Sequence, residues 1–367
     1  MKIKCAKADL LTGIGIVLKA VPAKTTMPIL DCILLKAVNG QIALVGNDME
    51  LGIETVVRGD IIEEGIIALN AKNFSDIVRK LPDNDVTIET DASLNTKINC
   101  EKTKFNISAK EGSEFPGLPQ IEKSKKVTMS QFTLRSIIVQ TVFSISDNEN
   151  VKVMTGELFE IKGNKMRAVA LDGHRIAVRN IELKEDFGNY KVIVPGKALN
   201  EISKILSGET EDEVNIYFSD KNIMFELEDT VILSRLIEGE YYKIDQMLSS
   251  DFETKITVNK RELFNSIDRA TLLIKESDKK PVVIETSDQI LNLRMNTQIG
   301  TLDDEINIEK EGKDIVIGFN PKFIIEALRV IDDENIDIYL VNSKSPCFIR
   351  DSAENYIYLI LPVNIVA

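Results

Sequence analysis

Hydrophobic and polar residues follow the same order of patterns three times along the chain. Near the middle of each third, a strand-like apolar run leads through Asn or Pro into a short helical pattern, at 65–81, 190–206 and 314–331. The matching apolar positions are Phe74, Leu199 and Phe323, which are 125 and 124 residues apart. Self-similarity at a fixed spacing predicts three copies of one structural unit.

Each third also begins with a strand pattern that runs into a helix pattern, at 3–21, 127–143 and 256–274. Strand patterns separated by turn dipeptides, such as Asn39-Gly40, lie between and after the helices. The predicted helices are 7–20, 71–81, 129–146, 196–207, 259–275 and 321–331. Each unit is therefore expected to pack two helices against a largely antiparallel sheet, which places the chain in the α+β class.

The length of 367 residues exceeds what one hydrophobic core ordinarily holds. Two linker-like stretches, 116–126 and 243–255, separate the repeated patterns. We predict three similar domains, at 1–120, 127–245 and 254–367.

With 44% apolar and 28% charged residues, the chain has the composition of a soluble globular protein. No apolar run reaches the roughly 18 residues that a membrane-spanning helix needs. Lys2, Lys4 and Lys7 precede an apolar stretch, as in a secretory signal. Asp9 and Lys19 in the same stretch favour an amphipathic helix of the mature protein instead.

Cysteine usage indicates the redox compartment. Cys5, Cys32, Cys100 and Cys347 are far apart, and no pair has a spacing typical of zinc binding or of a disulfide framework. We therefore expect a reducing cytoplasm, no metal and no cofactor.

The net charge of −13 at first argues against a polyanionic partner such as DNA. The six predicted helices, however, contain 14 Lys and Arg against 6 Asp and Glu, a net of +8, which leaves −21 for the rest of the chain. Six helices on one side of a curved array would form a basic surface inside an acidic exterior. Since Trp is absent and no aromatic platform accompanies the lysines, such a surface would contact phosphates and not read sequence. The alternative is that the basic helix surface only faces solvent and binds no partner.

Several short motifs support a specific family. They are MPIL (27–30), NDMELGIE (47–54), EFP (114–116), LDGHRIAV (171–178), VIVPGKAL (192–199), SRLIEGEY (234–241), IGFN (317–320) and YLILPV (358–363). In this order, and together with the threefold repeat, they resemble the bacterial DNA polymerase III β subunits, the replicative sliding clamps, over the whole chain.

The resemblance implies a non-catalytic processivity factor with the DNA clamp fold, in which each chain forms half of a closed ring. Two chains would join head to tail as a homodimer and encircle double-stranded DNA without sequence specificity. The implied partners are the DNA polymerase III α subunit, the clamp loader and other proteins with a clamp-binding motif. For the joint between subunits, the resemblance implies Ile77, Leu81, Phe105, Leu272 and Leu273, all of which could equally be core residues.

We define a candidate DNA face by eight basic residues. The family pattern implies Lys24 and Lys197, and the charge of the predicted helices adds Lys72, Arg79, Arg135, Lys204, Arg269 and Lys322.

His174 is the only histidine of the chain. A catalytic role, with Asp172 as its partner, lacks a nucleophile motif, and a metal site lacks clustered ligands. The corresponding pairs in the other repeats, Met49-Glu50 and Gln298-Ile299, differ from His174-Arg175, so the second repeat has a requirement of its own.

The resemblance implies that this turn forms one wall of a groove that binds short partner peptides. This candidate groove comprises Met154, Leu171, Gly173, His174, Arg175, Ile176, Met247, Leu359, Ile360, Leu361, Pro362 and Val363. Leu359 and Leu361 could instead belong to an ordinary buried strand. Leu171, Tyr242, Gln246 and Asn364 depart from residues frequent in the family, which puts the peptide preference in doubt.

Two other classes of function remain open at this point. One is a repeat-built interaction scaffold without a role on DNA, which the negative charge would suit. The other is a hydrolase that uses Asp172 and His174.

Overall fold

The computed structural model describes the chain except for residues 124–125, 249–250, 275–279, 352, 354 and 366–367. The chain forms two compact units, Met1–Phe132 with Lys204–Leu236, and Thr133–Ser203 with Ile237–Ala367. Residues of the predicted central domain, 127–245, belong to both units. The three domain boundaries stay a prediction.

The first unit contains two antiparallel sheets. The five-stranded sheet has the order β5 (Asp60–Glu63), β1 (Lys2–Ala6), β7 (Asp85–Thr90), β8 (Asn95–Cys100) and β9 (Thr103–Ser108). The nine-stranded sheet has the order β10 (Lys110–Glu111), β6 (Gly65–Asn70), β2 (Cys32–Val38), β3 (Gln41–Asn47), β4 (Leu51–Val57), β18 (Thr230–Arg235), β17 (Asn222–Glu226), β16 (Glu213–Phe218) and β11 (Lys126–Ser130).

Helices α1 (Lys7–Val17) and α2 (Ala71–Lys80) pack on the sheets of this unit. Asn70 caps α2 by accepting a hydrogen bond from the backbone N–H of Asn73. Gly46 allows the end of α1 to approach β3 closely, because a Cβ there would lie 2.2 Å from the carbonyl oxygen of Val17.

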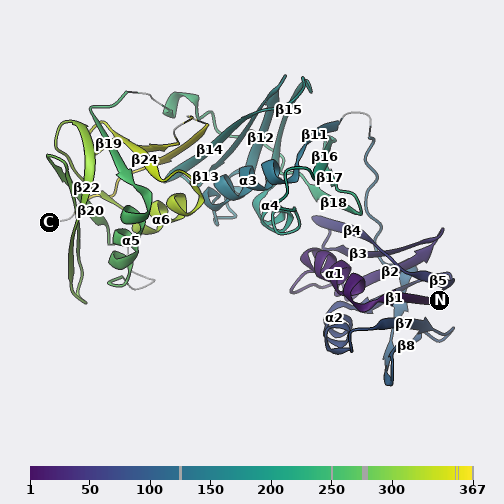
Figure 1. Cartoon of the computed structure of the whole chain (residues 1–367). Coiled ribbons are helices and arrows are strands. Elements are labelled where there is room, and N and C mark those ends of the chain that lie inside the picture. The colour runs from purple at the N-terminus through teal and green to yellow at the C-terminus, as the bar shows by residue number, and fades with distance from the viewer. Residues whose placement is uncertain (124–125, 249–250, 275–279, 352, 354, 366–367) are drawn as a thin grey trace. The chain divides into compact units, whose positions relative to one another are not determined.

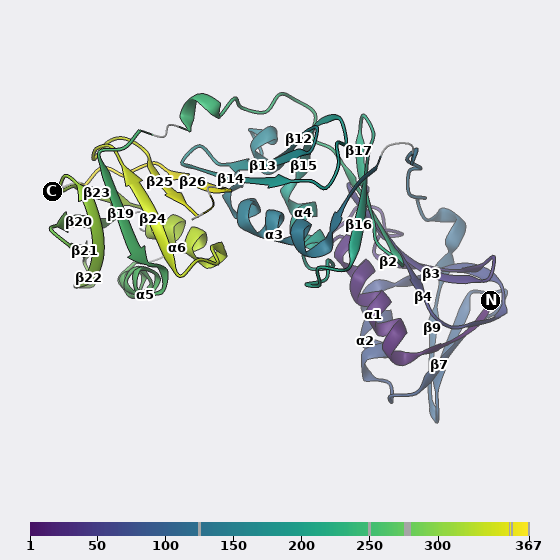
Figure 2. The ribbon, with the colours of Figure 1, turned by 45° about the horizontal axis from the view of Figure 1, so that its top comes forward.

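The second unit contains one twelve-stranded antiparallel sheet. Its order is β15 (Asn189–Pro195), β12 (Gly156–Lys162), β13 (Lys165–Leu171), β14 (Arg175–Glu182), β26 (Tyr356–Ile360), β25 (Cys347–Arg350), β24 (Asn335–Leu340), β19 (Thr254–Asn259), β22 (Thr301–Gly312), β21 (Ile290–Asn296), β20 (Val282–Ser287) and β23 (Val316–Phe319). Its helices are α3 (Gln131–Thr141, with its first two residues in the other unit), α4 (Gly196–Ile202), α5 (Lys260–Thr271) and α6 (Pro321–Val330). Figures 1 and 2 show these helices along the same side of the strands from β15 to β24.

The antiparallel pair β14–β26 connects the second and third sequence repeats within this sheet, with Ile176 opposite Leu359 and Arg175 opposite Ile360. Side chains of β26 alternate between two apolar clusters. Tyr358 and Ile360 join the cluster beneath α5 and α6, whereas Leu359 joins a cluster on the other face. The strand pair therefore has a core on each side.

The predicted α+β class and the six predicted helices are confirmed, although several helices end earlier than expected. Residues 18–20 and 142–144 form 3-10 turns, and α4 ends at Ile202. The end of the predicted helix 259–275 lies partly outside the described residues. Asn39 and Gly40 form the expected turn, with φ angles of 53° and 75°. Among the described residues, no helix has the length and apolar character to cross a bilayer.

Candidate functional sites

The turn between β13 and β14 is organised by one carboxylate. Oδ1 of Asp172 accepts hydrogen bonds from the backbone N–H groups of His174, at 2.9 Å, and Arg175, at 3.1 Å. Gly173 has a φ of 91°, which a side chain would disfavour. The Asp172-Gly173 pair therefore acts as the predicted turn and presents His174 at its tip.

Arg175 turns inward from this tip. Its side chain is 7% exposed, and Nε donates to Oδ2 of Asp172 at 2.9 Å. Nη1 donates to the carboxylate of Glu326 on α6, and Nη2 donates to the carbonyl oxygen of Phe143 at 2.6 Å. The guanidinium carbon lies 4.4 Å from the ring centre of Phe323. Arg175 therefore fixes the turn to α6 and does not line an open surface.

His174 is exposed, and its ring stacks on Phe323 with 6.3 Å between ring centres and 24° between planes. Its carbonyl oxygen accepts a hydrogen bond from the N–H of Leu361 at 2.8 Å. Both carboxylate oxygens of Asp172 are engaged by the turn and by Arg175, so no contact supports a catalytic pair with His174. Among the described residues, no group of three or more His, Cys, Asp or Glu could hold a metal ion.

The apolar members of the candidate groove separate into three sets. Leu171, Ile176 and Leu359 are buried in one cluster, and the half-buried Met154 packs against it. Ile360 lies in the cluster on the opposite face of the sheet. The exposed and half-buried positions at the chain's end are Leu361 (38% exposed), Pro362 and Val363 (36% exposed).

The segment before β19 contributes Met247, which is 50% exposed. Tyr241 and Ile244 anchor this segment in the same cluster as Leu171, and Asp245 accepts a hydrogen bond from Arg167 at 2.6 Å. The departures Tyr242 and Gln246 are exposed, as is Asn364 at the chain's end, so they can contact a partner.

Sequence reasoning missed Phe323, Glu326 and Phe143 as neighbours of the turn. Phe323 appeared only as an apolar repeat position, and nothing in the local pattern linked α6 to a turn about 150 residues earlier in the chain. The pairing of β14 with β26 brings the third repeat, and with it α6, beside the turn, whereas Phe143 lies in a 3-10 turn of the second repeat that packs on β14.

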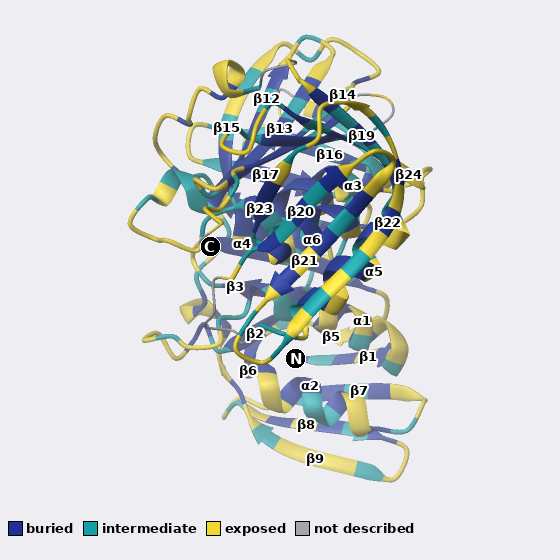
Figure 3. Cartoon of the chain, turned by 90° about the vertical axis from the view of Figure 1, so that its left-hand side faces the viewer, coloured by how far each residue is buried: buried dark blue, intermediate teal, exposed yellow. Residues whose placement is uncertain are grey.

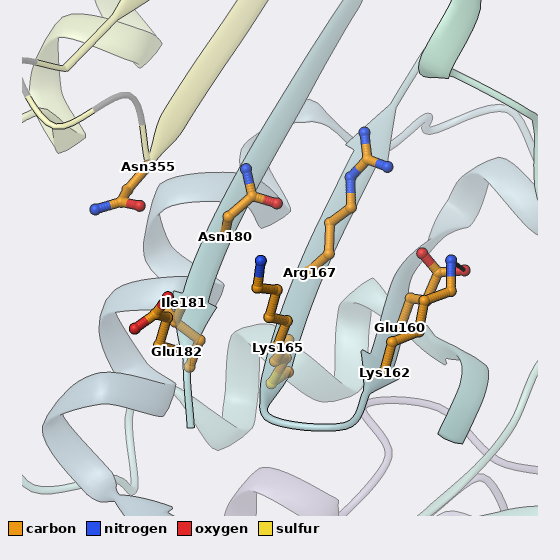
Figure 4. A pocket seen from close by; sticks show the side chains of 9 residues that line it. Glu160, Lys162, Lys165, Arg167, Asn180, Ile181, Glu182 and Asn355 are labelled. Atoms are coloured by element: carbon orange, nitrogen blue, oxygen red, sulfur yellow. Dashed lines mark ion pairs between the residues drawn. The ribbon is translucent and has the colours of Figure 1, made fainter. Parts of the chain in front are cut away.

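A hollow lies on the face of β12, β13 and β14 that carries the cluster of Leu171 and Ile176. It is at the ends of these strands that are farther from the Asp172-Gly173 turn (Figure 4). It is lined by Glu160, Lys162, Lys165, Met166, Arg167, Asn180, Ile181, Glu182 and Asn355. Both charge signs are present, and two of its cations are already paired, Lys162 with Glu160 and Arg167 with Asp245. The lining therefore favours neither an anion nor a cation.

All eight residues of the candidate DNA face are exposed. The observed helices contain 11 Lys and Arg against 6 Asp and Glu, a net of +5, in a chain of net charge −13. The bias is smaller than predicted because the helices are shorter. Lys204, for example, lies in a turn after α4, and Lys24 lies in a loop.

Some of these cations have acidic neighbours. Arg269 pairs with Asp304, Arg79 with Asp76 at 3.4 Å, and Lys197 with Glu149 at 3.4 Å. The exposed pairs cost little to separate, so they leave the side chains available to phosphate.

The five candidate joint residues differ in exposure. Leu81 is buried, whereas Ile77 and Leu273 are half-buried. Phe105 is 37% exposed on β9, an edge strand that is mostly exposed (Figure 3). Leu272 is 78% exposed just after α5. Leu81 is therefore a core residue, whereas Leu272 is too exposed to belong to the core of the chain.

Comparison with known proteins places this geometry in a family. The models of the N-terminal, central and C-terminal domains of the DNA polymerase III beta subunit match residues 1–119, 128–243 and 245–364. The chain belongs to the DNA polymerase III beta subunit family. Its fold is accordingly the three-domain sliding clamp fold, and its family consists of non-catalytic processivity factors of DNA replication.

Individual relatives agree over nearly the full length. The beta sliding clamp of Staphylococcus aureus is 32% identical over 365 residues, which cover 96% of this chain and 97% of the relative. A putative DNA polymerase III beta subunit from Eubacterium rectale is 59% identical, with a TM-score of 0.95 and full coverage of both chains. The sliding clamp of Bacillus subtilis is 32% identical, also with a TM-score of 0.95 and full coverage.

Proposed function

We propose that two copies of this chain join head to tail into a ring that encircles double-stranded DNA in the cytoplasm and tethers polymerase III and other partners to it. The main support for this proposal is that the chain belongs to the sliding clamp family over its whole length and that its helices have an excess of positive charge. Enclosure requires no tight contact with DNA, so a modest and salt-sensitive attraction is enough.

Two strand edges that have no partner among the described strands support closure by a second copy. β9 is at the edge of the five-stranded sheet, and residues 301–307 of β22 pair on one side with β21, while β19 pairs only with residues 308–312. Edges of this kind are completed by another strand or protected from it. Glu305 and Asp303, which pairs at 3.2 Å with Arg294, lie on the β22 edge, and Lys104 lies on β9, so the carboxylate of Glu305 complements the charge of Lys104.

Apolar side chains flank the same two elements. Phe105 on β9 and Ile77 on α2 would meet Leu272 and Leu273 of the second copy, which would cover the 78% exposed Leu272. A heterologous contact that closes after two copies consumes both edges and prevents filament growth.

The candidate groove would bind partner peptides that carry a glutamine followed by apolar anchors. Support comes from the exposed apolar side chains of Met247, Leu361 and Val363, which follow Ile244 and Leu359 of the buried cluster along the chain. Methionine adapts its shape to different apolar partners, which suits a site shared by several proteins. Removing residues 362–367 should therefore weaken binding of a Gln-x-x-Leu-Phe peptide.

Solution mass tests the proposed ring. We expect about twice the 41.1 kDa of the chain by sedimentation equilibrium, and a monomer for Leu272→Asp, since a charge would be buried in the joint. Ile62→Asp is the matched control, because Ile62 is 60% exposed on β5, at the opposite edge of the five-stranded sheet from β9. A wild-type monomer at micromolar concentration would contradict closure by two copies.

A further inference from the structure

Arg175 joins three elements of the second unit directly behind the exposed ring of His174. Its donors reach Asp172 in the turn, the carbonyl oxygen of Phe143 after α3, and Glu326 on α6. The side chains of Arg175, Asp172 and Glu326 are 7%, 13% and 22% exposed. The contact is therefore largely removed from solvent.

This burial makes the geometry of the contact specific. A guanidinium presents its donors in a rigid plane, so three simultaneous acceptors fix both its position and its orientation. Removing one charge from a buried pair leaves the other without compensation, whereas exposed pairs contribute little. Glu326 consequently sets where α6 lies relative to the turn.

Phe323 transmits that placement to His174. It lies one helical turn before Glu326 on α6, with its ring 4.4 Å from the guanidinium carbon and 6.3 Å from the His174 ring centre. Its carbonyl oxygen accepts a hydrogen bond from the Tyr358 hydroxyl at 2.9 Å, and Tyr358 belongs to β26. A shift of α6 would thus move the ring on which His174 stacks.

We propose that Glu326 and Phe323 are positioning residues for the candidate groove, and that they act through Arg175 and the His174 ring. The inference rests on the proposed peptide-binding function of that surface. Glu326 contacts no peptide in this account. It holds α6 against the turn, so that His174 and Leu361, joined through the His174 carbonyl, keep the spacing that a peptide requires.

His174 provides a direct probe because it is the only histidine in the chain. In protein labelled with ¹³C-histidine, its ring should give one set of NMR signals that is sensitive to the stacked Phe323 ring. Glu326→Gln keeps the size of the side chain and an acceptor for Arg175 but removes the charge. We expect this variant to shift the His174 signals and to weaken binding of a synthetic Gln-x-x-Leu-Phe peptide about tenfold.

Three further variants separate positioning from stability. Glu334→Gln makes the same change at an exposed site after α6 and should leave the signals and the affinity unchanged. Phe323→Leu should shift the His174 signals most, because the stacked ring is gone. Glu326→Asp restores the carboxylate and should recover most of the affinity.

The outcomes are distinguishable. If Glu326→Gln lowers the melting temperature but leaves the His174 signals and the affinity at wild-type values, the pair is only structural and the inference is overturned. It is also overturned if the signals shift while the peptide binds as before. If the wild type does not bind the peptide and the signals still shift, the positioning of His174 stands and the proposed groove function fails.

Discussion

The first and second repeats use the same turn for different purposes. In the first, Oδ1 of Asp48 accepts hydrogen bonds from the N–H groups of Glu50 and Leu51, at 2.9 and 2.6 Å, much as Asp172 does in the second. The side chains that follow differ: Glu50 is exposed, as is His174 at the matching position, but the next residue is the buried apolar Leu51 in the first turn and Arg175, buried against α6, in the second. A shared backbone thus leaves two positions free to acquire a specific role.

The linkers that follow the repeats differ in the same sense. After the first repeat, the side chain of Leu118 covers Gly52, where a Cβ would lie only 2.3 Å from its Cδ2. Asn47 also donates to the carbonyl oxygen of Pro116 at 3.2 Å, so this linker is attached to the turn itself. After the second repeat, the linker is attached through Asp245 to Arg167 on β13, and Met247 stays half exposed. The first linker therefore covers part of its own turn, whereas the second leaves Met247 accessible to a partner.

The largest expected effect is a difference in how much substitutions in the two turns lower the stability of the protein. Arg175→Ala should lower the free energy of unfolding by about 3–5 kcal/mol, because it removes a buried guanidinium that pairs with Asp172 and Glu326, and only Lys322, at 4.0 Å, then stays near Glu326. Glu50→Ala, at an exposed position of the first turn, should change it by less than about 0.5 kcal/mol. Urea denaturation measures both, and equal effects would remove the distinction between the turns.

A second contrast lies one strand away. Glu157 in β12 is fully buried. When the two strands are aligned by the turns that follow them, its counterpart in β2 of the first repeat is Ile33. Burial raises the pKa of Glu157 to about 8, although Thr141 donates a hydrogen bond to it at 2.5 Å. Tyr241 is the other titratable group near it, and burial and the Glu157 charge raise the pKa of that hydroxyl as well.

The sign of the pH dependence follows from these shifts. The pKa of Glu157 in the folded protein lies above its ordinary value of 4.5. The stabilisation of the fold by the protonated carboxyl is therefore fully present below pH 4.5 and is lost as pH rises toward 8. Between pH 6 and 8 the wild type should lose about 1–3 kcal/mol more stability than Glu157→Gln. Denaturant titrations at the two pH values measure this difference, and parallel curves for both proteins would show that the carboxyl is not protonated in the folded state.

A smaller effect concerns binding. His174→Ala should weaken the Gln-x-x-Leu-Phe peptide about tenfold, since it removes one wall of the candidate groove. Glu50→Ala at the corresponding position of the first turn should leave binding unchanged, because this turn lies outside the candidate groove. Isothermal titration calorimetry with each variant compares them, and an equal loss in both would place the peptide elsewhere.

The smallest effect tests the cover on the first turn. Leu118→Ala should cost about 1 kcal/mol, because the side chain is only half buried. It should also increase hydrogen exchange at residues 47–52 without changing exchange at residues 171–176. Unchanged exchange at the first turn would show that Leu118 does not cover it in solution.

The sequence predicted the periodic parts of the fold well. Helix positions, the Asn39-Gly40 turn and the Asp172-Gly173 turn all depend on local patterns. Helix ends were less accurate, since the chain leaves α-geometry after Thr141, whose hydroxyl is engaged by Ile137 and Glu157. A local pattern contains no information about such a distant partner.

The candidate site shows the same limit. The pattern indicated that His174-Arg175 is special to the second repeat, but it could not show that Arg175 points inward to Glu326, 151 residues away. The periodicity of a strand predicts which of its residues share a face of the sheet, but it does not identify the neighbouring strand. The burial of Ile360 on the helix side follows from the pairing of β26 with β14.

Retention on DNA of different topology tests enclosure most directly. After loading by a clamp loader, protein bound to nicked circular duplex should survive a wash at high salt, and cutting the circle once should release it, because only a linear molecule offers an end to slide from. Equal retention on the intact and the cut DNA would contradict a ring that holds DNA by enclosing it.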